Sequence, residues 1–345
     1  MNAAIIGATG YGGADLIRLL HNHPEVELSS VHSSSQQGVA MDESYPHLQG
    51  LATQQLEDID PVLIGQKADI VFLSTPPGIS SAITPKLLSE GLKVIDLSGD
   101  LRLKDSSLYE TWYKETPATE EVLNKAVYGL TEWAKESVKG AELISNPGCY
   151  PTATLLGLAP LVQEKLVEPD SIIIDAKSGV TGAGRSPSAV THFSEMNDNF
   201  KIYKVNQHKH IPEIEQGLKA WDESCSTVTF STHLVPMTRG IMATIYGKAT
   251  KPITEQQLRK LFEEKYQGSP FVRIRKEGQF PSTKEVYGSN YCDIGVTYDE
   301  RTGRITVVSV IDNLMKGAAG QAVQNLNVMI GAEEKAGLDF TPIFP

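Results

Sequence analysis

A glycine-rich segment near the N-terminus restricts the fold more than any other feature of this chain. The segment from Gly7 to Gly13 follows a short apolar run, Ala3–Ile6, and opens a stretch with helical spacing, Tyr11–Leu20. Glycine permits a tight turn and a close backbone approach to a phosphate, and the N–H groups at a helix start stabilise the phosphate charge. The order strand, glycine turn, helix therefore predicts a dinucleotide-binding unit, and a turn that needs glycine only for its backbone angles is the alternative. The predicted cofactor contacts here are Gly7, Thr9, Gly10, Tyr11, Gly12 and Gly13.

Strand and helix patterns alternate through the first 150 residues. The strand-like runs are Ala3–Ile6, Val26–His32, Asp69–Ser74, Val94–Leu97 and Leu143–Ser145, and helical spacing occurs at Tyr11–Leu20 and Ser81–Leu88. Such alternation predicts an α/β domain built on a Rossmann-type, doubly wound parallel sheet.

After Gly157 strand-like runs dominate and only one clear amphipathic helix, Thr254–Tyr266, interrupts them. The runs are Ile172–Asp175, Thr227–Leu234, Ile241–Ala249, Phe271–Lys276, Asp293–Tyr298 and Arg304–Ile311. The last two flank a short polar turn and predict a hairpin, so this part is expected to be an α+β domain. A final helix, about Lys316–Ile330, starts with small residues and is expected to pack on the first domain. A ligand cleft is expected between the two domains.

Composition narrows the class of protein. A chain of 345 residues with 40% hydrophobic and 21% charged residues suits two globular domains. Its net charge of −11 and its lack of a basic cluster argue against nucleic acid or an anionic membrane as a partner. No leader pattern and no span-length apolar run is evident, and three widely spaced cysteines do not suggest a disulfide framework. The expected location is the cytoplasm.

The end of the second predicted strand bears on the choice of dinucleotide. An NAD site usually places Asp or Glu there to hold the ribose 2′-hydroxyl, but no acidic residue follows this strand before Asp42. Hydroxyl groups can instead donate to a 2′-phosphate, so Ser33 and Ser34 predict a preference for NADP(H). A flexible serine loop without a ligand is the alternative.

Cys149 is the predicted nucleophile. It lies in Ser145-Asn146-Pro147-Gly148-Cys149-Tyr150-Pro151-Thr152, between a strand and a long apolar helix expected to start near Pro151. A helix start stabilises a thiolate and lowers the pKa of the thiol. Cys225 and Cys292 lie within or beside strand-like runs without such a context and are expected to be buried and unreactive.

The histidines of His208-Lys209-His210-Ile211-Pro212-Glu213 are the predicted acid/base partners of the thiol. The sequence does not choose between His208 and His210, although one catalytic and one structural histidine is the expected division. Two histidines could also bind a metal, but no third ligand is evident nearby, so no metal is predicted.

Three arginines are predicted to bind the anionic substrate, because arginine is suited to phosphate and carboxylate groups. Arg102 follows a predicted strand, Arg185 ends the glycine-rich loop from Ser178, and Arg239 follows another strand. Ser178 and Gly179, at the start of that loop, are predicted substrate contacts as well. A surface ion pair is the alternative for each arginine.

Taken together, these motifs resemble the N-acetyl-gamma-glutamyl-phosphate reductase family over essentially the whole chain. The cysteine segment from Ile144 to Pro160 is the most specific part, and the segment from Ile311 to Ala322 also matches. Three positions depart from the family pattern: Pro76 stands where histidine is frequent, Lys209 stands where arginine is usual, and Ser33–Ser35 lacks a frequent arginine.

The resemblance implies a fold and a reaction. The expected fold pairs an NADP-binding Rossmann domain (1–148 plus 314–345) with an α+β glyceraldehyde-phosphate/semialdehyde-dehydrogenase-like domain (149–313) for catalysis, substrate binding and oligomerisation. The expected reaction is reduction of N-acetyl-glutamyl 5-phosphate to the semialdehyde by NADPH, through a thioester on Cys149, in a homodimer or homotetramer. The resemblance also places Ser74, Pro76, Asn313, Gly317 and Gln321 beside the cofactor and Arg102 beside the phosphate.

Two other readings remain open at the level of sequence. The same chemistry could act on another acyl phosphate, either aspartyl phosphate or a carrier-linked aminoadipyl phosphate. A non-catalytic NADP-binding redox sensor would keep Cys149 but would have no use for the arginines or for His208 and His210.

Overall fold

The structure, a computed structural model, describes residues 1–225 and 227–345. The chain forms two compact units: Met1–Pro147 with Ala318–Asp339, and Gly148–Gly317 with Phe340–Pro345. Within the described residues, no helix is long and apolar enough to cross a membrane.

The first unit contains a seven-stranded sheet in which every neighbouring pair is parallel, in the order β3-β2-β1-β4-β5-β7-β6. Its strands are β1 (Asn2–Ile6), β2 (Glu27–His32), β3 (Leu56–Glu57), β4 (Ile70–Leu73), β5 (Lys93–Asp96), β6 (Val127–Tyr128) and β7 (Leu143–Ser145). The chain winds outward from β1 in one direction and from β4 in the other, so the carboxyl ends of β1 and β4 flank the switch point where such sheets bind ligands. The predicted doubly wound parallel sheet is confirmed.

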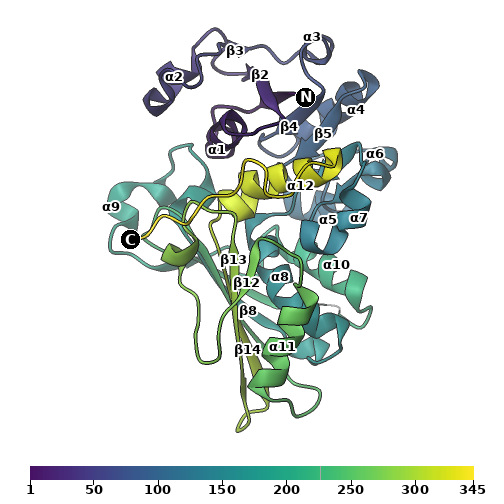
Figure 1. Ribbon diagram of the computed structural model, residues 1–345, viewed down its shortest axis with the longest axis vertical. Helices are drawn as coiled ribbons and strands as arrows, with labels where there is room; N and C mark the ends of the chain where they lie inside the picture. The colour runs from purple at the N-terminus through teal and green to yellow at the C-terminus, as the bar shows by residue number, and fades with distance from the viewer. Residues whose placement is uncertain (226) are drawn as a thin grey trace. The chain divides into compact units, whose positions relative to one another are not determined.

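Alternate strand residues point to opposite faces of this sheet, and all four residues of β4 are apolar and buried, so helices have to cover both faces. Ala4, Ile6 and Val71 belong to a buried cluster with residues of α3, α4 and α6. The C-terminal α12, yellow in Figure 1, packs against α1 and α7 of the same unit. The helices are α1 (Tyr11–His21), α2 (Met41–Ser44), η1 (Pro46–Leu48), α3 (Pro61–Gly65), α4 (Ile79–Ser89), α5 (Ser106–Tyr113), α6 (Glu120–Lys125), α7 (Thr131–Val138) and α12 (Gly320–Ile330).

The second unit contains a mixed seven-stranded sheet in the order β12-β13-β14-β11-β8-β10-β9. Its strands are β8 (Ile173–Ser178), β9 (Lys201–Tyr203), β10 (Thr229–Leu234), β11 (Ile241–Lys248), β12 (Val272–Ile274), β13 (Cys292–Asp299) and β14 (Arg304–Ile311). Strands β13 and β14 pair antiparallel across the turn at residues 300–303, so the predicted hairpin is confirmed. The α+β character expected for this part of the chain is confirmed as well.

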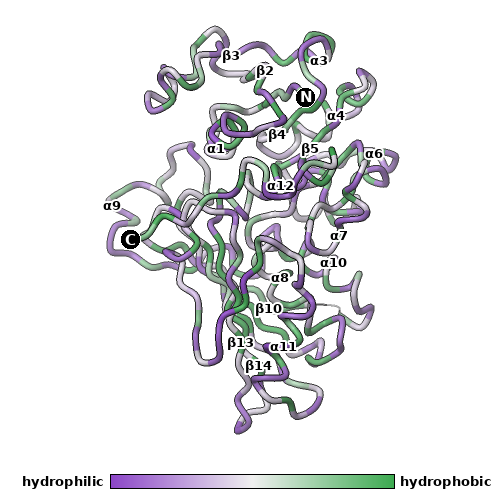
Figure 2. Tube along the Cα trace, in the orientation of Figure 1, coloured by the Kyte–Doolittle hydropathy of each residue, from purple (hydrophilic) through white to green (hydrophobic). Residues whose placement is uncertain are grey.

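Three longer helices of the second unit lie on one face of its sheet. Figure 1 shows α8, α10 and α11 on the same side of the strands, and α8 contacts β11, β13 and β14. The burial of β11 follows from this arrangement, because Ile241, Ala243 and Ile245 are buried whereas the alternate residues are half-buried. Figure 2 shows the apolar residues along β13 and β14 in green. The helical segments are α8 (Cys149–Gln163), η2 (Pro169–Ser171), η3 (Val180–Ala183), η4 (Ala189–Thr191), α9 (Phe193–Met196), α10 (Ile211–Trp221), α11 (Glu255–Lys265), η5 (Thr283–Val286) and the π-helical turn η6 (Met315–Ala319).

Candidate functional site

Cys149 is the first residue of α8. The helix begins two residues before the predicted start at Pro151, because Gly148 takes the extended N-cap conformation (φ −68°, ψ 156°) and needs no side-chain cap. The side chain of Cys149 is half-buried, whereas Cys225 and Cys292 are buried as expected. The positive end of the α8 dipole stabilises the thiolate form of a cysteine at this position.

Gly317 lies directly against Cys149. A Cβ atom placed on Gly317 would come within 2.8 Å of the Cys149 Cβ and 3.2 Å of its Cα. Any larger residue would therefore displace the cysteine. Glycine is therefore required at position 317 because of its contact with Cys149 within the second unit. The contact of Gly317 with the cofactor stays a prediction.

The sequence did not identify Glu213, which fixes the start of α8. Its buried carboxylate accepts a 2.8 Å hydrogen bond from the Gly148 N–H through Oε1. Glu213 stands in the first turn of α10, three residues after His210, the N-cap of that helix. An acidic residue three positions after an N-cap is a pattern that the sequence shows. The hydrogen bond of this residue to Gly148, 65 residues away, could not be predicted from that pattern.

His208 is enclosed by aromatic rings. Its ring lies 5.3 Å from that of Tyr150 and 5.7 Å from those of Tyr203 and Phe230, measured between centroids. Its Nδ1 accepts a 3.2 Å hydrogen bond from the His210 N–H, so in this neutral ring the proton sits on Nε2. Burial, with smaller contributions from Lys204 and Lys209, lowers the pKa of His208 to about 3.

This lowered pKa makes the stability of the fold depend on pH. An unfolded histidine has a pKa of about 6.5, so between about pH 3 and 6.5 the unfolded chain binds the proton more readily than the folded chain. The contribution to the free energy of unfolding is complete above pH 6.5 and is lost as the pH falls toward 3. At pH 5 the expected loss is about 2 kcal/mol, at 1.36 kcal/mol per pH unit.

Urea unfolding at pH 7 and pH 5 tests this expectation. The wild type should lose about 2 kcal/mol more between the two pH values than His208→Gln, which cannot titrate. His47→Gln, at an exposed histidine, is the matched control and should behave as the wild type does. An equal pH response of wild type and His208→Gln would contradict the lowered pKa.

His210 occupies a different environment. It is buried, and its ring lies 4.7 Å from that of His208 and 6.0 Å from that of Tyr150. It is the N-cap residue of α10 but makes no side-chain capping hydrogen bond there. Its N-cap position puts it three residues before Glu213, whose carboxylate accepts from the Gly148 N–H next to Cys149.

A pair of tyrosines completes the cluster around the histidines. The hydroxyl oxygens of Tyr150 and Tyr203 lie 3.1 Å apart, and the Tyr150 hydroxyl also donates to the His233 carbonyl at 3.4 Å. Burial raises the pKa of Tyr203 to about 12 and also raises the pKa of Tyr150, and the charge of a Cys149 thiolate adds to both effects. Both phenols therefore stay protonated near the thiol at neutral pH.

The predicted substrate residues of the second unit lie on two loops that are tied together. Asn313 accepts a 2.7 Å hydrogen bond from the Gly240 N–H and donates a 3.0 Å bond to the Thr181 hydroxyl. A Cβ atom on Gly179 would come within 2.7 Å of the Thr238 carbonyl oxygen, so glycine is required where the loops meet. The Ser178–Arg185 loop is thereby held beside residues 237–240.

The two arginines on these loops differ. The Arg239 Nη1 lies 3.6 Å from the buried Asp312 Oδ1, and Asp312 also accepts hydrogen bonds from the main chain at Gly288, Leu314 and Met315. Arg185 is exposed, as are the three residues before it, whereas Ser178 and Gly179 are buried. The ion-pair alternative therefore describes Arg239 in this structure. Substrate binding by Arg185, Arg239, Ser178 and Gly179 stays a prediction.

In the first unit the glycine turn forms a tight cradle at the switch point. Gly7 has φ +86°, and a Cβ atom there would lie 2.3 Å from the Ser74 carbonyl oxygen. Cβ atoms on Gly12 and Gly13 would lie 2.7 Å from the Ser74 hydroxyl oxygen and 2.6 Å from the Ala8 Cα. Gly10 is the N-cap of α1 and gives no side-chain cap, so the first N–H groups of α1 are suited to an anion.

A second helix start in this unit already has an anionic partner. Asp100 is buried and accepts hydrogen bonds from the N–H groups of Gly78 and Ser81 at the start of α4, at 2.9–3.0 Å. This helix follows Ser74-Thr75-Pro76-Pro77. Of these two helix starts, α1 is therefore the one suited to a cofactor phosphate.

The other predicted residues of the first unit make main-chain contacts. Arg102 is buried, and its Nε and Nη2 donate to the carbonyls of Asn146 and Leu97 at 2.8 and 2.9 Å. Gln321 is buried and donates to the Gly129 carbonyl and the Thr131 hydroxyl. Ser33 is buried, whereas Ser34 is exposed. Ligand binding by these residues stays a prediction.

The described residues were also compared with the ligand groups that metal ions need. Over residues 1–225 and 227–345, no group of three or more His, Cys, Asp and Glu side chains is arranged to hold a metal ion.

Comparisons with known proteins agree with this geometry. The chain matches the semialdehyde dehydrogenase NAD binding domain over residues 2–141 and the semialdehyde dehydrogenase dimerisation domain over residues 149–313. Among solved structures, aspartate semialdehyde dehydrogenase II from Vibrio cholerae superposes with a TM-score of 0.71 at 18% identity, covering 95% of this chain and 97% of that chain. The Candida albicans aspartate semialdehyde dehydrogenase with NADP gives a TM-score of 0.69 at 17% identity, covering 97% and 98%. At these identities the likeness concerns the fold.

Curated relatives are similar over their full length. The N-acetyl-gamma-glutamyl-phosphate reductase of Geobacillus sp. (strain WCH70) is 63% identical over 345 residues, which is 100% of both chains. Those of Halalkalibacterium halodurans and Bacillus cereus (strain AH187) are 62% and 58% identical, again over 100% of both chains.

Proposed function

Because this chain belongs to the N-acetyl-gamma-glutamyl-phosphate reductase family, we propose that it reduces N-acetyl-L-glutamyl 5-phosphate to N-acetyl-L-glutamate 5-semialdehyde with NADPH, in arginine biosynthesis. The observation that carries the proposal is the half-buried Cys149 at the start of α8, whose N-cap is bonded to Glu213 three residues after His210. This arrangement provides a nucleophile and a proton acceptor on two helix starts that are tied together.

In the proposed reaction, His210 takes the proton of the Cys149 thiol, and the thiolate attacks the acyl carbon. The carbon–oxygen bond to the phosphate breaks, a thioester forms on Cys149, and the proton leaves with the phosphate. When bound, NADPH supplies a hydride to the thioester carbonyl. The carbon–sulphur bond then breaks, which releases the semialdehyde and leaves a thiolate, and a proton from solvent restores the thiol.

We assign the two histidines differently. His208 is proposed as the structural one, since its Nδ1 is bonded to the main chain and three aromatic rings enclose it. His210 is proposed as the acid/base, since it begins α10 beside the contact between Glu213 and Gly148.

For the cofactor, the glycine cradle of the first unit fits a dinucleotide. The proposed pyrophosphate contacts are Thr9, Gly10, Tyr11, Gly12 and Gly13 at the start of α1, with Gly7, Ser74 and Pro76 beside them at the switch point. Ser33 and Ser34 are proposed to hold the 2′-phosphate. We assign NADP binding to residues 1–148 with 314–345 and catalysis to 149–313, supported by the two units and the two matched domains.

We also propose that the chain forms a homo-oligomer and is located in the cytoplasm. A homodimer or homotetramer is supported by the description of the matched domain at residues 149–313. A cytoplasmic location is supported by three cysteines that form no disulfide, of which Cys149 has to stay reduced to act.

The reverse reaction tests the substrate. Purified protein should reduce NADP only when both phosphate and N-acetyl-glutamate 5-semialdehyde are present, and aspartate semialdehyde should be at least about tenfold poorer in kcat/KM. Equal or better activity with aspartate semialdehyde would assign a different acyl group, and no phosphate-dependent activity with any semialdehyde would contradict the reductase proposal.

Cofactor preference gives a further expectation. One or two hydrogen bonds from Ser33 and Ser34 to a 2′-phosphate, at about 1.5–3 kcal/mol each, would favour NADPH over NADH by roughly ten- to a thousandfold. The low end is expected, because no arginine stands in this segment. Ser34→Asp should lower kcat/KM for NADPH at least about tenfold, because a carboxylate repels the 2′-phosphate.

Ser89→Asp, at an exposed serine in the same unit, is the control and should keep the wild-type preference. A wild type that prefers NADH, or a Ser34→Asp variant with unchanged NADPH kinetics, would place the 2′-phosphate elsewhere.

A further inference from the structure

A tyrosine from a distant segment contacts the glycine turn of the first unit. The Tyr45 hydroxyl donates a 3.0 Å hydrogen bond to the Thr9 carbonyl, 36 residues earlier in the chain, and the tyrosine is half-buried. Thr9 belongs to the turn between β1 and α1 that is proposed to bind the cofactor pyrophosphate. The proposed function gives Tyr45 no role, so this hydrogen bond needs an explanation of its own.

The Thr9 carbonyl is part of the peptide group that leads into α1. Because a peptide group is planar, holding the Thr9 carbonyl oxygen also holds the Gly10 N–H on its opposite side. This N–H donates to the Gly7 carbonyl at 3.2 Å, and Gly10 is the N-cap of α1. The hydrogen bond from Tyr45 therefore fixes the orientation of the peptide from which the first N–H groups of α1 start.

The first part of the turn is held by the main chain of β2. The N–H groups of Gly7 and Ala8 donate to the His32 carbonyl at the end of that strand, at 2.9 and 3.3 Å. Glycine-rich backbone has many accessible conformations, so a turn attached at one end would lose entropy when it orders around a ligand. Tyr45 provides a second attachment, at Thr9.

Tyr45 is itself held in place by the segment that carries it, residues 36–55. It stands between α2 and η1, where its N–H donates to the Met41 carbonyl and its carbonyl accepts from the Leu48 N–H, both at 2.8 Å. Met41 and Leu48 are buried, and the Tyr45 ring packs edge-on against His47 with centroids 5.7 Å apart. The hydroxyl therefore needs little reorganisation when a ligand binds.

The same segment starts beside the serines proposed for the 2′-phosphate. Ser33 and Ser34 follow β2 directly. The Met41 N–H donates to the Gln54 carbonyl at 3.0 Å, which closes residues 36–55 into a loop. The segment thus connects the proposed 2′-phosphate residues with the glycine turn.

We propose that Tyr45 is a positioning residue for the dinucleotide: it holds the Thr9 carbonyl so that the start of α1 is oriented toward the pyrophosphate. The pyrophosphate is common to NADPH and NADH, whereas Ser33 and Ser34 are proposed to contact only the 2′-phosphate of NADPH. Tyr45 should therefore raise the affinity for both cofactors by the same factor and leave the preference between them unchanged. The inference rests on the proposed cofactor site of the first unit.

Tyr45→Phe tests the inference, because it removes the hydroxyl and keeps the ring. The dissociation constants of NADPH and NADH, measured by fluorescence titration of the full-length protein, should both rise by the same factor, about three- to tenfold, the contribution of one hydrogen bond. In steady-state assays KM for NADPH should rise by a similar factor while kcat stays near the wild-type value. A loss of folded protein would instead lower the amount of cofactor bound without changing its dissociation constant.

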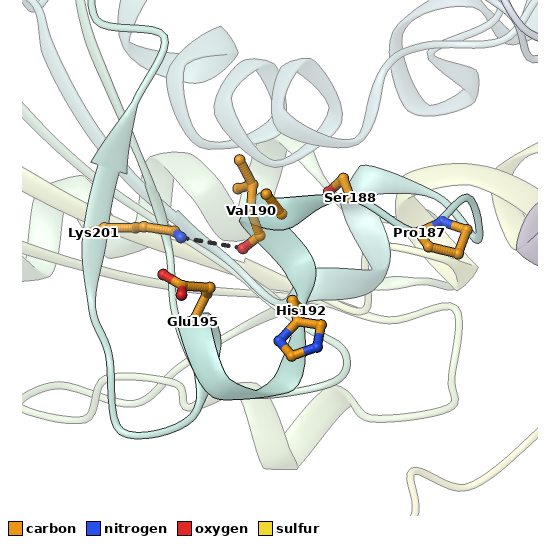
Figure 3. A pocket seen from close by; sticks show the side chains of 7 residues that line it. Pro187, Ser188, Val190, His192, Glu195 and Lys201 are labelled. Carbon is orange, nitrogen blue, oxygen red and sulfur yellow. Dashed lines mark hydrogen bonds between the residues drawn. The ribbon is translucent and has the colours of Figure 1, made fainter.

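The matched control removes a hydrogen bond of the same kind from the second unit. There the Lys201 ammonium donates a 3.1 Å bond to the Val190 carbonyl, in an open groove that both residues line (Figure 3). Lys201→Met removes this donor and should leave both dissociation constants unchanged. Tyr298→Phe, at a half-buried tyrosine of the same unit, should leave them unchanged as well.

Three results would overturn the inference: unchanged dissociation constants in Tyr45→Phe, an equal rise in the controls, or a rise for NADPH alone, which would place Tyr45 at the 2′-phosphate. A wild type that binds neither cofactor would overturn both this inference and the proposed dependence on NADPH. Because the titrations need no substrate, a protein whose cofactor binding depends on Tyr45 but which lacks activity would contradict the reductase proposal alone.

Discussion

Serine in place of Cys149 is expected to lower kcat on the order of 10³-fold or more while leaving NADPH binding nearly unchanged. A thiol at the start of α8 can ionise near neutral pH, whereas a serine hydroxyl in the same place cannot, so the covalent step is lost. Cofactor binding should survive because the glycine cradle belongs to the other unit. Steady-state rates and NADPH fluorescence titration measure the two effects separately.

Cys292→Ser is the matched control for this substitution. Cys292 is buried in β13 of the same unit, and its sulphur lies 3.4 Å from the Ser309 hydroxyl, so serine should be accommodated with a kcat near that of the wild type. Intact-mass measurement with acyl phosphate and no NADPH should detect an acylated wild type and an unmodified Cys149→Ser variant. A Cys149→Ser variant that keeps a tenth of the wild-type rate would exclude the thioester route.

Asparagine at His210 should slow the reaction by roughly 10²- to 10⁴-fold, the usual contribution of general acid/base catalysis. The reason is its place at the N-cap of α10, three residues before the carboxylate that holds the Gly148 N–H beside Cys149. The pH profile of its alkylation by iodoacetamide should shift to higher pH, because the Cys149 thiol then ionises without its base. Its melting temperature should stay close to that of the wild type, since asparagine caps helices well.

The companion variant, His208→Asn, should show the opposite pattern. It removes a ring that contacts Tyr150, Tyr203 and Phe230, so the melting temperature should fall while kcat changes less than for His210→Asn. A large loss of kcat with His208→Asn and none with His210→Asn would reverse the assignment. Wild-type rates in both variants would direct attention to His192 or His233.

Much of the first unit could be predicted from local patterns. Strands β1, β2, β4, β5 and β7 lie within a residue or so of the predicted runs, because short apolar segments bounded by turn residues have few other stable conformations. The glycine turn could also be predicted, and the geometry explains why glycine is needed at positions 7, 12 and 13. Gly7 needs a positive φ, and the backbone of Ala8 leaves no room for a side chain on Gly13.

Short elements were less predictable. Strand β9 has three residues and no alternation, and helices such as α9 have about one turn, so their local signal is weak. Strand β9 exists because Lys201–Tyr203 pairs with Thr232–Leu234 across almost 30 residues of chain. That pairing also brings Tyr203 to Tyr150, and nothing in the local sequence of either residue indicates it.

The sequence alone determined the class of fold, because the alternation of strand and helix patterns along the chain is visible without any contacts. It also determined the position of the thiol at a helix start and the candidate histidine pair, because each depends on residues within one turn of one another. Only the tertiary structure decided how these histidines differ: the rings around His208 come from α8, β9 and β10, and the carboxylate that holds Gly148 comes from α10. Contacts between elements far apart in the chain follow from strand pairing and helix packing. Those depend on the whole core, and a local pattern records only whether a residue is apolar, small or charged.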